Sequence, residues 1–587
     1  MILVRGVAIL CCAYLAITCF DVEPLNAAAF GSRAAGDSAT FVCRELLGRP
    51  TGNSIALNFC ADKNLDAYVE YGTQRGVYGS QSPLQSFQGG IPSTITIANL
   101  TPNTRYYYRV RYRVGGSGEF LARAEHTFQT ARPKGSEFVF AIEADPHMDT
   151  STSPQLFKRT LANILSSNSD FLIDLGDTFM SEKIPSVNQN DVTGRNLLLR
   201  SCFDTAGHSV PLMLVQGNHD GELGWLLDGT ADNLAIWATN TRKAYYPNPA
   251  PDNFYSGDTT NAKFTGVRQN YYAWEWGNAL FVVLDVYWYT AKKPGSTKNN
   301  WDWTLGKTQY DWFRKTLETS KADFKFVFAH QVVGGSDTEG RGGIEAAPYY
   351  EMGGLNGDGT PGFAANRPGW AKPIHQLMVE NRVSAFFHGH DHVFVKQDLD
   401  GIVYHELPQP GYFNFSSPDK SYSNAGLASK YGYTHGDILS SSGFLRVTVS
   451  NTGATVDYVR TYLPEHENSQ RKNGEIAYSY TLKKSTTATS VERNSASPDQ
   501  FDLSQNYPNP FNPETAINYT LTARSFVDLK VYDVLGREVA TLVDRYQEAG
   551  TYTVTFNSQR YALKSGVYFY RLVAGNTSET RKLLLAK

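Results

Sequence analysis

Six apolar runs recur through the middle of this 587-residue chain, and they constrain its fold more than any other feature. Each run is of strand length and apolar throughout or nearly so, which is typical of strands buried on both faces. Helical stretches separate several of them, as in an α/β domain. The predicted strands are Phe138 to Ala144, Phe171 to Leu175, Leu212 to Val215, Leu280 to Asp285, Phe324 to Ala329 and Val383 to Phe387.

Other elements complete this domain. Helices are predicted at Gln155 to Leu165, Lys307 to Thr319 and Lys372 to Asn381. Further strands, expected to finish a second sheet, are predicted at Ile402 to Leu407, Phe444 to Val449 and Thr455 to Arg460. Loops as long as the glycine-rich stretch from Gly334 to Gly369 are usually functional. We expect that stretch and the tyrosine-rich region from Tyr245 to Tyr272 to form the walls of a substrate cleft.

A chain of this length is too long for one core, so we expect several domains. Residues 1–29 read as a signal peptide, because Arg5 precedes an apolar run from Gly6 to Phe20 that is shorter than the about 20 residues of a membrane span. Residues 36–132 show short alternating strands, residues 136–482 hold the α/β pattern, residues 483–500 are a Ser- and Thr-rich linker, and residues 501–587 are again all-β.

Net charge and cysteine content limit the partners and the disulfide pairing that the chain can have. The net charge is -3, and no basic stripe suggests a nucleic-acid partner. We expect no transmembrane helix in the mature chain. Three of the six cysteines would leave with the signal peptide, and an odd number remains: Cys43, Cys60 and Cys202. Cys43 and Cys60 could form a disulfide between two strands, or could be two small buried apolar residues.

Polar residues follow five of the predicted strands. They are Asp145-Pro146-His147, Gly176-Asp177, Gly217-Asn218-His219-Asp220, His330 and Gly389-His390-Asp391-His392. Open α/β sheets build their sites at the carboxyl ends of strands. Taken singly, Asp145 could cap a helix, Asn218 could hold a turn and His330 could be a core histidine. Five such coincidences favour a single site.

This residue set suits a two-metal centre. Two cations need a shared anionic bridge and further ligands each, and a carboxylate can hold two ions about 3.5 to 4 Å apart. Seven candidate ligands are available. None is a cysteine, so the mixed oxygen and nitrogen donors suit Mn, Fe, Zn or Ni better than soft metals.

The order DxH, GD, GNHD, H, GHxH resembles the calcineurin-like metallophosphoesterases over about residues 137–462, and the preceding β domain resembles the purple acid phosphatase branch. The resemblance implies a four-layer α/β (α+β) sandwich holding two metal ions, of which Fe, Mn or Zn are the candidates. Asp145, His147 and His392 would bind one ion, Asn218, His330 and His390 the other, and Asp177 would bridge them. His219 would be the general acid or a transition-state donor.

Two positions depart from this family pattern. Met180 stands where purple acid phosphatases have a tyrosine and many relatives an acid, and those phosphatases lack an equivalent of His147. The colour of a tyrosinate–iron bond should therefore be absent, and the group that orients the general acid must come from elsewhere. Asp220 is a catalytic candidate for that role, or a solvent-facing turn acid. His375 and His388 are interpreted as structural or as supports of the ligands.

Two flanking regions also resemble known families. The stretch from Leu100 to Val110 resembles the fibronectin type III strand corner, with Tyr106 at the tyrosine-corner position. The last 87 or so residues resemble the type A sorting domain of the type IX secretion system, in the runs beginning at Leu503, Asp528 and Ser565. That resemblance implies the type IX machinery as a partner, and secretion or surface attachment in a Gram-negative bacterium.

The sequence therefore predicts a secreted or cell-surface, metal-dependent hydrolase of phosphomonoesters or phosphodiesters with a small-molecule substrate. The alternative is a catalytically silent binding or adhesion protein on the same fold. All seven ligand positions are filled, which favours the enzyme. A nuclease would need a basic groove that the sequence lacks.

Overall fold

The computed structural model describes residues 39–412, 422–484 and 501–586, apart from single positions 524, 548, 560, 562 and 576. It divides into two compact units, residues 1–486 and residues 487–587. The predicted signal peptide lies outside the described residues, as does nearly all of the predicted linker. No helix within the described ranges is long and apolar enough to cross a membrane.

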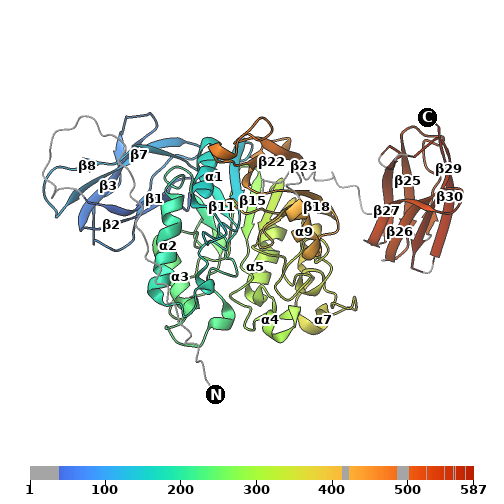
Figure 1. The fold of residues 1–587 in the computed structure, drawn as a ribbon, viewed down its shortest axis with the longest axis horizontal. Helices are drawn as coiled ribbons and strands as arrows, with labels where there is room; N and C mark the ends of the chain where they lie inside the picture. Colours follow the sequence, from blue (N-terminus) through green and yellow to red (C-terminus); the bar gives the residue numbers. More distant parts are fainter. Residues whose placement is uncertain are drawn as a thin grey trace, which may run out of the picture. The chain divides into compact units, whose positions relative to one another are not determined.

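The N-terminal region, blue in Figure 1, is an all-β sandwich of two sheets around its own apolar core. In its longest pair of strands buried residues alternate with more exposed ones, as expected where only one face is covered. Tyr106 accepts a hydrogen bond from the Thr101 amide at 2.9 Å, which is the predicted tyrosine corner. The strands are β1 (Phe41–Gly48), β2 (Ile55–Ala61) and β6 (Ser93–Ile97) in one sheet, and β3 (Leu65–Gly72), β4 (Ser80–Gln81), β5 (Gln85–Phe87), β7 (Arg105–Val114), β8 (Leu121–Ala122) and β9 (His126–Gln129) in the other.

The central domain is built on two packed sheets. The first has the order β12 (Leu212–Leu214), β11 (Leu172–Asp174), β10 (Phe138–Glu143), β21 (Gly443–Val449), β22 (Gly453–Arg460), β23 (Ile476–Lys483). The second has the order β13 (Ser256–Gly257), β14 (Tyr272–Trp276), β15 (Ala279–Val283), β16 (Phe324–Phe328), β17 (Ala385–His388), β19 (Ile402–Glu406), β18 (Phe394–Leu399), β20 (Asp437–Leu439). β10 to β12 run parallel, and so do β15, β16, β17 and β19.

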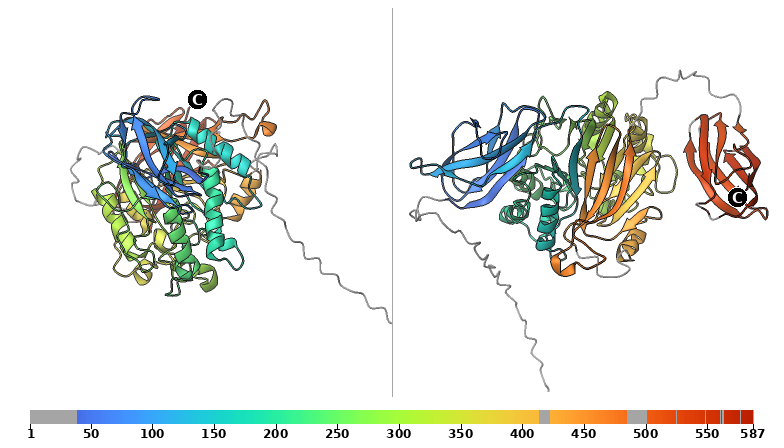
Figure 2. Two further views of the ribbon diagram at one scale, coloured as in Figure 1. Left: turned by 90° about the vertical axis from the view of Figure 1, so that its left-hand side faces the viewer. Right: turned by 90° about the horizontal axis from the view of Figure 1, so that it is seen from above.

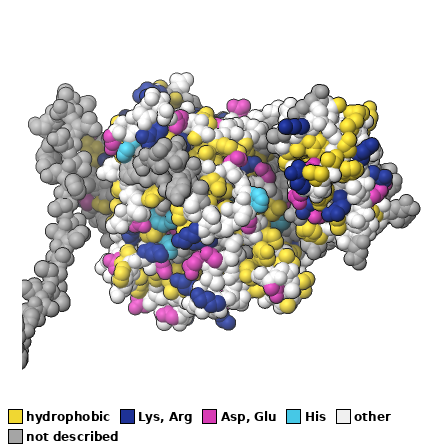
Figure 3. Space-filling view, turned by 45° about the vertical axis from the view of Figure 1, so that its right-hand side comes forward, with side chains coloured by type: hydrophobic (Ala, Val, Ile, Leu, Met, Phe, Trp, Pro, Cys, Tyr) yellow, Lys and Arg dark blue, Asp and Glu magenta, His cyan; other side chains and the backbone are white. Residues whose placement is uncertain are grey.

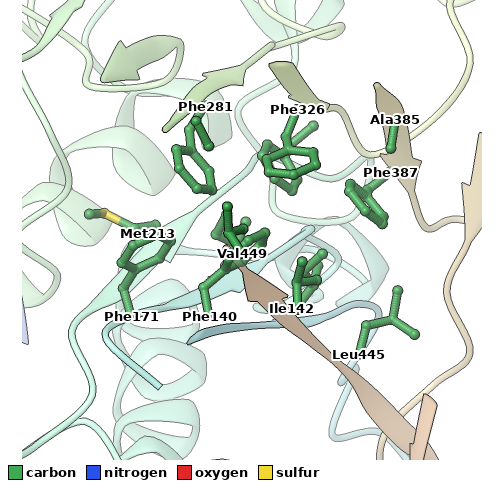
Figure 4. Close-up of a cluster of buried hydrophobic side chains, with 14 of the residues drawn as sticks. Phe140, Ile142, Phe171, Met213, Phe281, Phe326, Ala385, Phe387, Leu445 and Val449 are labelled. Carbon is green, nitrogen blue, oxygen red and sulfur yellow. The ribbon is translucent and has the colours of Figure 1, made fainter. Parts of the chain in front are cut away.

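The core between the two sheets is largely aromatic. Phe140 and Phe171 from the first sheet region meet Phe281 and Phe326 from the second, with ring centroids 5.0 to 5.6 Å apart (Figure 4). These rings are fully buried. Edge-to-face pairs of this kind add to the free energy gained by apolar burial, so the two sheets are held in a fixed relation.

Helices cover the outer face of each sheet, which gives four layers (Figure 1). The first sheet is covered by α1 (Pro154–Ser166) and α2 (Gln189–Phe203), with α3 (Leu234–Tyr245) beside α2; α5 (Gly306–Thr319) and α8 (Ile374–Glu380) cover the second. α1 begins where the sequence provides a cap, because Ser153 Oγ accepts from the Leu156 amide and proline follows at the first helical position. Shorter helices in the loops are α4 (Pro294–Thr297), α6 (Tyr350–Gly353), α7 (Phe363–Asn366) and α9 (Tyr422–Lys430).

The expected α/β core with flanking all-β regions is confirmed, but two strands were assigned to the wrong sheet. The strands near Phe444 and Thr455 were expected in a second sheet, whereas β21 and β22 extend the first sheet: β21 pairs antiparallel with β10, and β22 pairs antiparallel with β21. Only the strand at Ile402, which is β19, belongs with β17 in the second sheet. Apolar content marks a buried strand and does not identify its neighbour.

The N-terminal sandwich packs against the central domain beside α2 (Figure 2). The buried Arg200 guanidinium of α2 donates to Asn58 Oδ1 at 2.6 Å and to the carbonyl of Arg44 in the sandwich. Cys43 and Cys60 face each other across β1 and β2, also at this interface, and both are free thiols in the structure.

Two stacked histidines at this interface should make stability depend on pH. The His126 and His208 rings are 4.0 Å apart. Burial, and then the adjacent His126, lower the pKa of His208 from 6.5 to about 4, and burial also lowers the pKa of His126. Between pH 6.5 and 4 the unfolded chain therefore binds more protons than the folded chain, so folding stability falls as the pH drops through this range, by on the order of 2 to 3 kcal/mol.

We expect the melting temperature of the wild type to fall more between pH 7 and pH 5 than that of His208→Gln, measured by circular dichroism. Glu45 forms an ion pair with Arg123 nearby, and its pKa is lowered, so its carboxylate should be charged at both pH 7 and pH 5. Equal falls in the melting temperatures of the two proteins would contradict the assignment of this pH dependence to His208.

The C-terminal region is a second all-β sandwich with its own core. One sheet has the order β24 (Asp502–Leu503), β25 (Glu514–Leu521), β28 (Gly550–Asn557), and the other β27 (Glu538–Gln547), β26 (Ser525–Tyr532), β29 (Gly566–Ala574), β30 (Thr577–Leu585). The runs at Asp528 and Ser565 correspond to β26 and β29, which pair with each other.

Candidate metal centre

The predicted site residues follow five strands drawn from both central sheets. Three of these strands belong to the first sheet: Asp145 and His147 come after β10, Asp177 after β11, and Asn218 and His219 after β12. The other two belong to the second sheet: His330 comes after β16, and His390 and His392 after β17. The site therefore lies where the carboxyl ends of the two sets of parallel strands meet.

The side chains form two groups that could each hold a metal ion. Asp145, His147, Asp177 and His392 make one group, and Asp177, His330 and His390 the other, with candidate ligand atoms in each group within 4.8 Å of one another. Asp177 belongs to both groups. Its Oδ2 lies 3.6 Å from His147 Nε2 in the first and 3.4 Å from His330 Nε2 in the second.

Several of these atoms are buried and have no hydrogen-bond partner in the structure. They are Asp145 Oδ1, His147 Nε2, Asp177 Oδ2 and His390 Nδ1. Burying polar atoms without partners costs free energy, so native proteins rarely do it without a ligand or ion. The other carboxylate oxygens are occupied: Asp145 Oδ2 accepts from the His390 amide and Asp177 Oδ1 from the His219 amide. The free oxygens therefore fit a cation.

Backbone carbonyls orient two of the imidazoles. His330 Nδ1 donates to the Leu175 carbonyl at 2.9 Å, and His390 Nε2 donates to the Glu339 carbonyl at 2.9 Å. A carbonyl only accepts, so the opposite nitrogen of each neutral ring presents a lone pair. His330 Nε2 then lies 3.0 Å from Asn218 Oδ1, another lone-pair donor, as expected for two ligands of a common ion.

Strong electrostatic coupling links the acids and imidazoles. Burial alone would raise the pKa of Asp177, but the nearby imidazoles of His330, His219 and His147 hold it well below its usual range. Burial would lower the pKa of His330, but Asp177 and Asp145 raise it to about 9. Without a cation, protons on the imidazoles balance the carboxylates, so metal binding should release protons.

His219 lies beside the two groups, and its partner is Glu182, which the sequence analysis missed. His219 Nδ1 is 3.0 Å from Glu182 Oε2, while its Nε2 is 3.1 Å from Asn218 Nδ2 and 3.9 Å from Asp177 Oδ2. Glu182 belongs to the short 3-10 helix η1 (Ser181–Lys183). The expected position, Met180, is a buried apolar residue with φ of 54°. Only the folded loop shows that an acid two residues further on reaches the imidazole.

The expectation that Asp220 faces solvent is wrong, and the acid in contact with the His219 imidazole is Glu182 instead. The Asp220 side chain is buried, and its carboxylate accepts from the backbone amides of Asp177, Gly217 and Phe179 at 3.1, 2.7 and 2.7 Å. Burial, and then the charge of Asp177, raise its pKa to about 7. Asp220 thus fixes the turn that carries Asn218 and His219.

Other predicted residues lie around the site. His388 Nδ1 contacts Glu406 Oε2 at 2.7 Å, and Glu406 Oε1 accepts from the Asp391 amide next to His390. His375, on α8, instead contacts Tyr404 and Asp400. Both histidines thus contact other protein side chains, which agrees with their interpretation as structural residues or supports of the ligands.

Of the two expected cleft walls, only one contacts the site. The stretch from Gly334 to Gly369 contributes the Glu339 carbonyl and Arg341, whose Nη1 donates to the His390 carbonyl at 3.1 Å. The five tyrosines between Tyr245 and Tyr272 are instead buried, and most belong to the apolar clusters. Tyrosine content did not distinguish a cleft lining from a core.

Comparison with known proteins agrees with the fold. Residues 138–394 match the calcineurin-like phosphoesterase family, and residues 505–586 match the secretion system C-terminal sorting domain. The central domain is therefore a calcineurin-like phosphoesterase domain, and the chain carries a C-terminal sorting domain of the type IX class. No curated protein matches the chain.

Solved structures with this fold include purple acid phosphatase PPD1 from yellow lupin (Lupinus luteus) seeds, at 15% identity, covering 75% of this chain and 74% of that one, with a TM-score of 0.50. A structure of PhoD matches at 14% identity, covering 76% of this chain and 90% of the other, with a TM-score of 0.54. At 14 to 15% sequence identity, these similarities show a shared fold and nothing finer.

Proposed function

We propose that this chain is an exported phosphoesterase that hydrolyses phosphate esters with two metal ions. The observation that carries the proposal is the sharing of Asp177 by two groups of candidate ligands. In this assignment Asp145, His147 and His392 hold one ion, Asn218, His330 and His390 hold the other, and Asp177 bridges them. The donors are carboxylate, amide and imidazole groups, which suits Fe, Mn or Zn.

When bound, such ions supply Lewis acidity toward phosphoryl oxygens and activate a water for attack on phosphorus. The residues of the chain do the rest. His219 donates a proton to the leaving oxygen, since it stands beside both groups without belonging to either. Glu182 holds the proton on His219 Nδ1 and keeps Nε2 directed toward the site.

Export is the second part of the proposal. The C-terminal sorting domain supports passage through the type IX machinery, with release or surface attachment outside a Gram-negative cell. We retain residues 36–132, 136–482 and 501–587 as the domains of the mature chain, with the leader at 1–29 and the linker at 483–500 as predicted.

The alternatives have less support. A silent binding protein would not need partnerless buried atoms at four ligand positions. A nuclease would need a continuous basic surface, whereas Lys and Arg are interspersed with Asp and Glu over the described part of the face in Figure 3.

The first test is metal content together with activity. We expect the purified mature protein to hold about two metal ions per chain after reconstitution. Elemental analysis measures the ions, and release of the phenol from an aryl phosphate measures turnover before and after chelation. Absence of metal after reconstitution would refute the centre, and two bound ions without turnover on mono- or diesters would favour the silent alternative.

A further inference from the structure

One arginine on α2 connects the two loops that carry Asp145, His147 and Asp177. The half-buried guanidinium of Arg195 donates from Nε to the Phe179 carbonyl at 2.6 Å, from Nη1 to the Met148 carbonyl at 3.0 Å, and from Nη2 to the His147 carbonyl. Among the described residues no carboxylate forms an ion pair with it. These three hydrogen bonds all go to the backbone of the two loops.

Both loops have backbone that needs external support. Asp145, His147 and Met148 in the first loop have φ of 58°, 55° and 48°, and Asp177 and Met180 in the second have 55° and 54°. Non-glycine residues adopt this left-handed region only at a cost in conformational free energy, and they keep it where surrounding contacts impose it. The carbonyls that Arg195 binds belong to or adjoin these residues.

We propose that Arg195 is a positioning residue that holds this half of the site in its ligand-ready shape before any metal binds. The inference rests on the proposed function, since it takes Asp145, His147, Asp177 and His392 as ligands. A planar guanidinium suits the role, because its fixed fork of N–H groups can bind three carbonyls at once, whereas an ammonium is a compact point charge.

Two of the three carbonyls that Arg195 binds belong to the loop of Asp145 and His147, which are in one ligand group only. His330 and His390, in the other ligand group, are held instead by the Leu175 and Glu339 carbonyls. Loss of Arg195 should therefore weaken one metal site more than the other. A merely structural role would affect the two sites alike.

The test compares Arg195→Gln and Arg195→Lys with wild type, as full mature chains stripped of metal. Calorimetric titration with Mn²⁺ or Zn²⁺ should show one of two binding events weakened about 10- to 100-fold in Arg195→Gln, the usual effect of losing a ligand support. The other event should stay within about threefold, and Arg195→Lys should recover part of the loss. Hydrogen exchange without metal should be faster at residues 145–149 and 177–181.

Arg159→Gln is a matched control, because Arg159 lies on the neighbouring helix α1 and pairs with Glu467 at 3.5 Å, and within the described part of the chain it forms no hydrogen bond or ion pair with either loop. It should leave affinities and exchange unchanged. Unchanged affinities and exchange in Arg195→Gln would overturn the proposal, and so would equal weakening of both events with a lower melting temperature of the metal-free protein. If the wild type bound no metal, the two-metal function would fail while the exchange experiment would still decide the role of Arg195 in the loops.

Discussion

Replacement of Asp177 by asparagine should remove more metal than any other single ligand substitution. Among the residues that the structure describes, Asp177 is the one common to both ligand groups, so its carboxylate is the candidate bridge. The asparagine amide offers only one good metal-binding atom, and the substitution removes the negative charge that would lie between the two cations. Because outer-shell changes alone cost about 10- to 100-fold in metal affinity, we expect Asp177→Asn to weaken both sites by more than about 100-fold.

Asp145→Asn is the matched comparison, since Asp145 is also a fully buried acid of the site but belongs to one group only. It should retain one ion per chain after dialysis, where Asp177→Asn retains close to none. Elemental analysis of both variants, with circular dichroism to verify folding, gives the answer. Equal metal loss in the two variants would argue against the bridge.

Replacement of His219 by alanine should leave both metals and lower turnover by about 10² to 10⁴, the usual contribution of general acid catalysis. The loss should depend on the leaving group. An aryl phosphate releases a stable phenolate without a proton, whereas an alkyl phosphate needs one, so the alkyl ester should suffer more. Steady-state rates on both esters, with metal content measured in parallel, test the role.

Glu182→Gln provides an intermediate case. The amide can still contact His219 Nδ1 but no longer stabilises the imidazolium, so the same leaving-group dependence should appear with a smaller loss. Loss of one ion in His219→Ala would make His219 a ligand. An equal loss on the two esters would leave His219 a stabiliser of transition-state charge and remove the proton-transfer role.

The strand ends were predictable because two local signals coincide there. An apolar run marks a buried strand, and a polar residue directly after it lies at the sheet edge, so the seven ligand candidates could be named before their positions were known. The geometry brings them together. Their roles as ligands remain predictions until metal is measured.

What the sequence did not reveal depends on contacts between distant segments. The charge of Asp220 is visible in the sequence, but the three amides that bury it are not. Glu182 and Arg195 reach the site only because the loop after β11 and helix α2 pack against it. The assignment of β21 and β22 to the first sheet likewise rests on pairing across about 300 residues of chain, which no local periodicity encodes.

The origin of the site in two sheets has a consequence for how the chain acquires it. Asp145 and His390 are separated by 245 positions in the sequence, yet the backbone amide of His390 donates a hydrogen bond to the carboxylate of Asp145. Such contacts form late, because closing so long a segment costs entropy that only the assembled core repays. A nascent chain would therefore lack affinity for a pair of ions until both sheets had docked, so ion uptake should coincide with the final stage of folding.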